Sequence, residues 1–149
     1  MAEQMLTDPN KFPPTVKVLY DYFMEITKGD KQKTFAGITS LSQKVQEDGA
    51  KLVHFGDVVF LVTVSGPHMI EMHAMIGGKP TEAEKMKELD TQLDKLLKYL
   101  KTIDVKLAYT YMAPNMQDKY SKILNGYKFK KSNIKGPDGK PYVAFYVEV

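Results

Sequence analysis

Two side chains that can exchange protons or bind a metal ion, Glu71 and His73, lie two residues apart in an alternating run at residues 68–76. Alternate residues of a β-strand point to the same side, so the carboxylate and the imidazole should share one face of a sheet. The structural alternative is a solvent-side Glu and a His held by a hydrogen bond. Both interpretations place the pair on a strand. Which groups the two side chains can contact therefore depends on the helices and strands around them.

A metal site would need more ligands than this pair supplies. The other histidines are His54 and His68, which fall on two predicted strands without the helical His spacing or Asp support of known metal sites. Cysteine is absent, which also excludes disulfide scaffolds and thiol catalysis. We therefore expect no metal ion.

All of the positive charge comes from lysine: the 149 residues include 21 Lys and no Arg, and the formal net charge is +3. Lysine lacks the planar fork that reads guanine in the major groove, so sequence-specific nucleic-acid binding is disfavoured. No apolar run approaches the ~20 residues of a membrane helix. Residues 1–10 lack the basic start and apolar core of a signal peptide, so we expect a soluble protein that is not exported by a standard signal.

Five lysines are clustered near the C-terminus: Lys128, Lys130, Lys131, Lys135 and Lys140. They could contact an acidic partner or a nucleic-acid backbone. The alternative is a solvated edge strand that lysine protects against aggregation.

The apolar periodicity predicts one domain at residues 15–149, after a polar lead at residues 1–14. Its element order is helix, helix, three strands, helix, strand, helix and two strands. The predicted segments are 16–26, 34–48, 51–55, 58–64, 68–76, 81–103, 107–112, 115–126, 127–134 and 141–149. A strand that follows a long helix needs a crossover, so the strands at 68–76 and 107–112 should pair in parallel. The expected fold class is α/β (α+β), a mixed sheet with helices on both faces.

Residues 115–129 predict an amphipathic helix between two turns. Asn115 is placed to cap the helix, and Gly126 can adopt the left-handed conformation that ends it. Tyr127 and Phe129 then alternate with Lys128, as in a strand.

This segment resembles the signature of the GCN5-related N-acetyltransferases (GNATs): Asn, seven residues, Tyr, then Gly-Phe. Gly126 and Tyr127 fall on that spacing, and Lys122 stands where the family has its Tyr. The element order at about residues 15–149 is also similar to the GNAT fold, although no strand-like run precedes the first helix. The resemblance implies a degenerate member of the family of the kind that phages encode.

The resemblance also implies acid–base roles, because acetyl transfer needs a base for the amine and an acid for the departing thiolate. It places the base at Glu71 or His73, acting directly or through water, and the acid at Lys122. An ammonium group, with an ordinary pKa of about 10.4, needs burial to act as an acid near neutral pH. Tyr120 lies about 200° around the helix from Lys122 and is expected in the core.

In the family, the acetyl-CoA pyrophosphate binds backbone N–H groups where the long helix begins. The corresponding residues here, Ile76, Gly77, Gly78 and Lys79, depart from the family's phosphate loop. The two glycines could let a ligand approach the backbone, and Lys79 could contact a phosphate. The alternative is that Gly-Gly only makes a turn.

The start of that helix also carries groups that oppose an anion. Thr81 and Glu84 have capping-box spacing, so they should occupy two of the free N–H groups. Glu82 and Glu84 would each oppose an anion ~5 Å away by up to ~3 kcal/mol at an effective dielectric near 20, before screening. The sequence therefore predicts a damaged pyrophosphate site.

We therefore expect a GNAT-fold protein with a degenerate acetyl-CoA site and no cofactor, which works as a non-catalytic interaction or structural component. Small Arg-free, Cys-free proteins of this topology resemble those of tailed phages, so protein partners, a larger assembly such as a virion, and a location in the virion or host cytoplasm are expected. The alternative is an active acetyl-CoA-dependent N-acetyltransferase of unknown acceptor.

Overall fold

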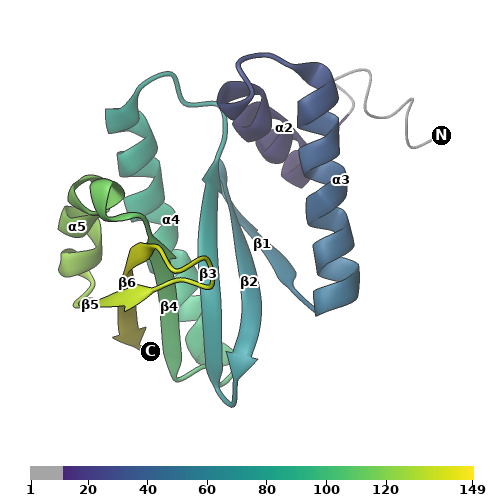
Figure 1. The fold of residues 1–149 in the computed structure, drawn as a ribbon. Helices are drawn as coiled ribbons and strands as arrows, with labels where there is room; N and C mark the ends of the chain where they lie inside the picture. The colour runs from purple at the N-terminus through teal and green to yellow at the C-terminus, as the bar shows by residue number, and fades with distance from the viewer. Residues whose placement is uncertain (1–11) are drawn as a thin grey trace.

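The computed structural model describes residues 12–149, and its element order is the predicted one (Figure 1). The elements are α2 (Pro14–Ile26), α3 (Lys31–Asp48), β1 (Lys51–Phe55), β2 (Val58–Gly66), β3 (Met69–Ile76), α4 (Glu82–Thr102), β4 (Leu107–Met112), the 3-10 turn η2 (Pro114–Met116), α5 (Gln117–Gly126), β5 (Lys130–Lys135) and β6 (Pro141–Glu148). No strand precedes α2 within residues 12–149. The mixed α/β class is confirmed.

The six strands form one sheet in the order β1-β2-β3-β4-β6-β5. All neighbours are antiparallel except β3 and β4, so the predicted parallel pairing is confirmed. This parallel pairing is short, running from Met69 opposite Leu107 to Glu71 opposite Tyr109. Beyond Glu71 the two strands diverge, as Figure 1 shows, while β4 stays paired with β6 up to Met112. The divergence opens the middle of the sheet.

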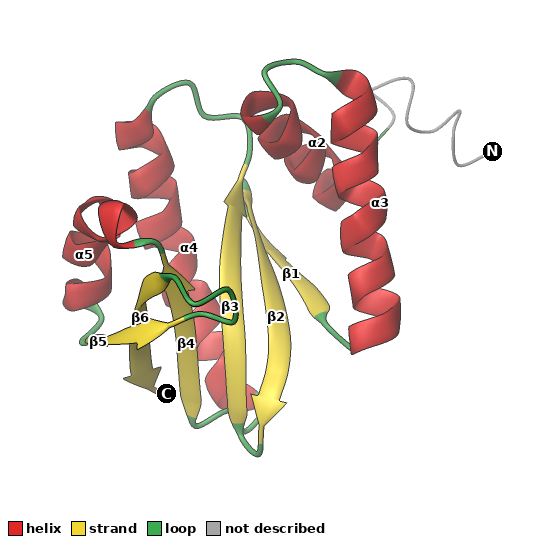
Figure 2. Ribbon diagram, in the orientation of Figure 1, coloured by secondary structure: helices red, strands yellow, loops and turns green. Residues whose placement is uncertain are grey.

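Helices cover both faces of the sheet, but unequally (Figure 2). Helices α4 and α5 pack on one face, and α2 and α3 pack on the other over the half that holds β1 to β3. Strand β2 is buried on both faces: Phe60 and Val62 belong to the α4 core, and Val59 and Leu61 to the α2 core. This double burial explains why the sequence of β2 is apolar at successive positions.

Two elements begin at residues other than the predicted ones, α3 because of its N-terminal cap and β3 because of the turn before it. Asp30 caps α3 by accepting a hydrogen bond from the Lys33 N–H at 3.0 Å, so the helix begins at Lys31 and not near Thr34. His68 has a positive φ of 58°, so it belongs to the turn and β3 begins at Met69.

The region after β4 corrects three expectations. Pro114 opens a 3-10 turn, which leaves Met116 at the N-terminal boundary of α5, so Asn115 is not the cap. Gly126 is still helical, and the residue with positive φ is Lys128, at 65°. The turn at Lys128 is closed by the Phe129 N–H, which donates to the Leu124 carbonyl at 3.0 Å. Strand β5 therefore begins after this turn, and not at residue 127.

The expectations about residues 1–10, including the absence of a signal peptide, lie outside the described residues, as does most of the lead at 1–14. Phe12 is described: it is buried and packs edge-on against Tyr20, with ring centroids 5.1 Å apart. Pro14 is the first residue of α2, where its fixed φ suits a helix start. None of the described helices is long and apolar enough to cross a membrane.

Candidate active site in the opened sheet

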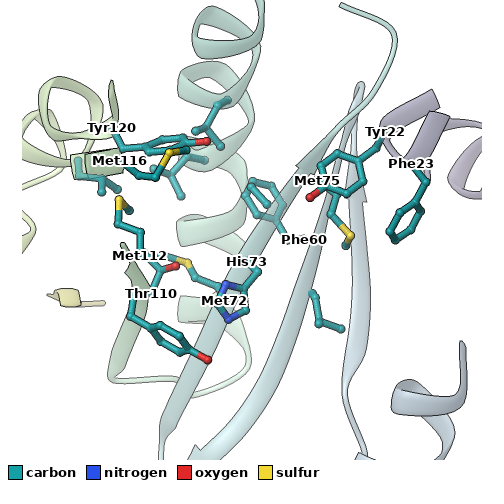
Figure 3. A pocket seen from close by; sticks show the side chains of 16 residues that line it. Tyr22, Phe23, Phe60, Met72, His73, Met75, Thr110, Met112, Met116 and Tyr120 are labelled. Carbon is teal, nitrogen blue, oxygen red and sulfur yellow. The ribbon is translucent and has the colours of Figure 1, made fainter. Parts of the chain in front are cut away.

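A cavity of about 440 Å³ fills the gap where β3 and β4 diverge (Figure 3). Its walls are mostly apolar and aromatic, and they come from α2, β2, β3, α4, β4, η2 and α5. The lining residues are Tyr22, Phe23, Phe60, Leu61, Met72, His73, Ala74, Met75, Leu89, Leu93, Thr110, Tyr111, Met112, Met116, Tyr120 and Leu124.

The cavity extends through the sheet and does not lie on one face only. Consecutive residues line it on both diverging strands, for example Met72 with His73 and Thr110 with Tyr111. Consecutive side chains of a strand point to opposite faces, so the cavity reaches both. The missing β3–β4 hydrogen bonds leave room for this passage.

Glu71 and His73 do share a face, and they contact each other. His73 Nε2 lies 3.0 Å from Glu71 Oε2, and both side chains are partly buried. The His73 ring meets Tyr111 edge-on at 5.3 Å, which fixes the imidazole at the cavity wall. Burial, and then the Glu71 charge, raise the pKa of Tyr111. The carboxylate can orient the imidazole at the cavity wall, and an oriented imidazole can exchange a proton with a group in the cavity.

Two tyrosines enter the cavity from opposite sides. Tyr22 comes from α2 and Tyr120 from α5, and Figure 3 shows both side chains directed into the space between these helices. Burial, followed by the proximity of Tyr120, raises the pKa of Tyr22. Tyr120 was expected in the core, yet it is only partly buried and lines the cavity. The i, i+4, i+8 spacing of Met116, Tyr120 and Leu124 was the sequence signal that these residues share one helix face.

Close packing against α2 explains why residue 77 is a glycine. Its N–H donates to the Asp57 carbonyl at 3.0 Å, and a Cβ added there would lie 2.4 Å from the Val18 carbonyl oxygen of α2. Lys79 Nζ lies 2.7 Å from Asp57 Oδ2, and this hydrogen bond raises the pKa of Lys79. The candidate phosphate-binding residues are thus bonded within the protein: Gly77 through its backbone and Lys79 through its side chain. Ile76, beside them, is buried in the core.

The N-terminus of α4 is joined to α2 and α5 by ion pairs. Glu82 pairs with Lys85 at 3.2 Å and also with Lys119 of α5, and Lys119, followed by Lys85, lowers the pKa of Glu82. Lys85 also pairs with Glu25 of α2. The sequence estimate treated the Glu82 charge as uncompensated, whereas in the structure two lysines compensate it.

The expected capping box at this end of α4 is half-formed. Thr81 Oγ1 accepts from the Glu84 N–H at 3.2 Å, as predicted. The return bond from the Glu84 carboxylate is not formed among the described residues, and the Glu84 side chain stays exposed. One N–H donor is therefore occupied, and the charge of Glu84 remains beside it.

No protein-family model matches this sequence, and no curated protein sequence matches it. Solved structures do match its fold. A spermidine N-acetyltransferase variant from Vibrio cholerae superposes with a TM-score of 0.57 at 14% identity, covering 78% of this chain and 76% of that one. A ribosomal-protein-alanine N-acetyltransferase from Brucella melitensis gives 0.54 at 9% identity, covering 76% and 78%. A GNAT-family acetyltransferase from Streptococcus pneumoniae gives 0.53 at 9% identity, covering 93% and 96%.

The chain has the GNAT fold. Identities this low establish the architecture alone, so the roles of individual residues depend on the geometry of this chain. In that geometry Glu71 and His73 are brought together at the cavity, whereas Gly77, Gly78 and Lys79 lie at the β3–α4 connection.

The observed turn differs from the one on which the match of Lys122 to the GNAT signature was counted. The sequence count took Gly126 as the left-handed residue, four positions after Lys122, but the structure places that conformation at Lys128. Four positions before Lys128 is Leu124, which is buried and lines the cavity. Lys122 is exposed and is not among the lining residues. Tyr120 is the residue of α5 that brings a hydroxyl to the cavity.

The described residues do not contain a set of side chains that could bind a metal ion. Within residues 12–149, no group of three or more His, Asp or Glu side chains is close enough to hold an ion. His54 instead contacts Thr15 Oγ1 and the Gly56 carbonyl, and His68 contacts Asp104.

Proposed function

We propose that this GNAT-fold protein has lost acetyl-CoA binding and works as a non-catalytic interaction component. The proposal depends on one observation: the polar groups at the β3–α4 connection already form hydrogen bonds and ion pairs within the protein. The Gly77 N–H and the Lys79 ammonium group bind Asp57, and Glu82 is held by two lysines. A pyrophosphate there would have to displace these partners, and it would also face the exposed Glu84.

The crowding by α2 adds a steric argument. The backbone of Val18 lies directly against Gly77, so there is no space for a ligand to approach the backbone on that side. The carboxylate of Asp21 lies next to Gly78, where an added Cβ would be 3.6 Å from its Oδ2. The residues present therefore do not fit a diphosphate, which needs free N–H donors and positive charge.

Isothermal titration of the full chain with acetyl-CoA tests the proposal. We expect no saturable heat at ligand concentrations up to the millimolar range. Micromolar or tighter binding that is lost in Lys79→Glu would overturn it. A companion variant, Glu82→Gln with Glu84→Gln, removes both carboxylates and should gain affinity for the cofactor if these charges oppose it.

An active acetyl-CoA-dependent N-acetyltransferase is the second candidate, and one observation favours it. His73, which contacts Glu71, and Tyr120 line the same cavity, so one group that can accept a proton and one that can donate a proton are present on its walls. A thiol-release assay with acetyl-CoA and a panel of amine acceptors tests it. Activity that falls at least tenfold in both His73→Gln and Tyr120→Phe would support the enzyme, whereas equal rates with and without the protein would exclude it for those acceptors.

The partners remain a prediction. We propose that the protein works in a larger assembly, which could be a virion. Sedimentation velocity of the purified chain and co-purification from its native source test that expectation.

A further inference from the structure

Half of one sheet face is left uncovered by helices. Helices α2 and α3 pack over β1 to β3, and the same face of β4 and β6 carries four tyrosines. They lie opposite in parity to buried residues such as Ala108 and Phe145, which face α4. We call them the tyrosine face: Tyr109, Tyr111, Tyr142 and Tyr146. None of the four belongs to either hydrophobic core.

The four tyrosines lie as two cross-strand pairs on β4 and β6. Tyr109 is the direct pairing partner of Tyr146, and Tyr111 meets Tyr142 edge-on with centroids 5.7 Å apart. Tyr111 is 37% exposed, and the other three are partly exposed. Aromatic rings held side by side on a rigid sheet can stack with flat groups at low entropic cost.

The β5–β6 hairpin and the turn before it, at the edge of the sheet, carry a set of positive charges without carboxylate partners among the described residues. Residues 128–140 include five lysines and one acidic residue, Asp138. All five lysines are exposed, and none forms a salt bridge with a carboxylate in the described part of the chain. The carboxylate of Asp138 instead accepts hydrogen bonds from the Tyr142 hydroxyl at 2.8 Å and from the Lys140 N–H at 3.0 Å.

These lysines differ from those at the other candidate site. Lys79, Lys85 and Lys119 are all neutralised by carboxylates of the chain itself, whereas the lysines of the terminal hairpin have no such partner. Lys130 pairs with Tyr146 across β5 and β6, so it lies on the tyrosine face itself, whereas Lys131, opposite Phe145, points to the other face of this edge strand. Strand β5 is the edge of the sheet, so its side chains can be reached from both sides.

We propose that the tyrosine face and the lysines of the β5–β6 hairpin bind single-stranded nucleic acid without sequence preference. Phosphates would contact the ammonium groups as point charges, and unpaired bases would stack on the tyrosine rings. The absence of arginine matches a surface that attracts phosphates without reading base edges. A duplex keeps its bases stacked inside and an acidic peptide has no bases, so neither would use the tyrosines. This binding does not rest on the proposed loss of acetyl-CoA binding.

Fluorescence anisotropy with a labelled 20-nucleotide oligothymidine and the full chain tests the proposal. The protein has nine Tyr and no Trp, so quenching of its tyrosine emission reports stacking directly. We expect micromolar affinity at low salt and a slope of log K against log salt of roughly −2, for about three phosphate contacts to a single strand.

Two matched triple variants test whether binding depends on the lysines of this surface or only on the total positive charge of the protein. Lys128→Gln, Lys130→Gln and Lys131→Gln together should weaken binding by roughly tenfold or more. The control triple Lys87→Gln, Lys95→Gln and Lys101→Gln removes the same charge from exposed positions of α4, also without salt bridges, and should change affinity less than about twofold.

Removing one ring isolates the stacking contribution. Tyr146→Leu keeps the charge and should weaken oligothymidine binding by roughly fivefold or more. Circular dichroism confirms that each variant is folded.

Four results with nucleic acid would overturn the proposal, and a fifth, with polyglutamate, would reassign the surface. The four are no binding at 50 mM salt, equal affinity for duplex and single strand, equal losses in the two lysine triples, and binding that is insensitive to Tyr146→Leu. If polyglutamate binds as tightly as oligothymidine, the surface is one for acidic polypeptides and the nucleic-acid assignment fails.

Discussion

Replacing Gly77 with alanine tests whether this residue is required for packing or for ligand approach. The added Cβ would lie 2.4 Å from the Val18 carbonyl oxygen and 3.1 Å from Val18 C and Cα, all of them backbone atoms of α2. Side-chain carbon atoms do not approach backbone closer than about 3.0 Å, so α2 would have to shift. Overpacking of this kind costs about 1–3 kcal/mol.

The expected change in thermal stability follows from the size of the domain. A loss of 1 kcal/mol lowers Tm by roughly 2–4 °C in a chain of about 150 residues, so a cost of about 1–3 kcal/mol should lower Tm by about 2–12 °C. Thermal and urea unfolding followed by circular dichroism measure the change.

Gly126→Ala is the matched control for this variant. Gly126 is helical, and an added Cβ there would meet nothing within 4 Å, so alanine should stabilise α5 by about 0.5–1 kcal/mol. The two substitutions should therefore shift Tm in opposite directions. A Gly77→Ala protein as stable as the wild type would refute the packing explanation and leave the glycine free for a ligand.

Two further predictions concern a helix cap and a titrating tyrosine. Thr81→Ala removes the acceptor for the Glu84 N–H and should lower the free energy of unfolding by about 1 kcal/mol, whereas Thr81→Ser should retain most of it; equal losses in urea unfolding would contradict the cap. Tyr127 donates its hydroxyl to the Asp90 carbonyl at 2.7 Å, and burial, followed by Asp90, raises its pKa from 10.0 to about 12. Because the folded state holds this proton more tightly, the stability that Tyr127 contributes is fully present below pH 10 and is lost as pH rises from about 10 to 12. Tyr127→Phe should flatten the fall in unfolding free energy over that range, and an unchanged slope would show that other groups cause it.

Local pattern was sufficient to predict most of the fold. The bounds of β1 and β4 were predicted to the residue, because alternation and flanking turns define short strands well. The parallel pairing of β3 with β4 followed from the long helix between them. These features depend on residues close together in the sequence or on general rules of chain connection.

The predictions were wrong at both ends of α5, where the conformation of a single residue mattered more than the apolar periodicity of the helix. Pro114 diverted the chain into a 3-10 turn and removed Asn115 from the cap position. Lys128 adopted the left-handed conformation that Gly126 was expected to take, so the turn comes two residues later than predicted. A periodicity argument cannot identify such a shift, because both registers bury apolar side chains of α5.

The ion pairs around α4 could not be predicted from sequence. Lys119 reaches Glu82 across 37 positions, and Lys85 reaches Glu25 across 60. The sequence therefore indicated the acidic character of this helix end but not its neutralisation by lysines of α4 and α5. The cavity was likewise not predicted, since it depends on where the β3–β4 pairing stops.

The most direct test of the account is a titration of the ¹⁵N-labelled protein with coenzyme A, followed by amide chemical shifts. The account predicts no saturable shift at the amides of Gly78, Glu82 and Ala83, where a pyrophosphate would bind the start of α4. Saturable shifts at those three amides with a micromolar midpoint would contradict it.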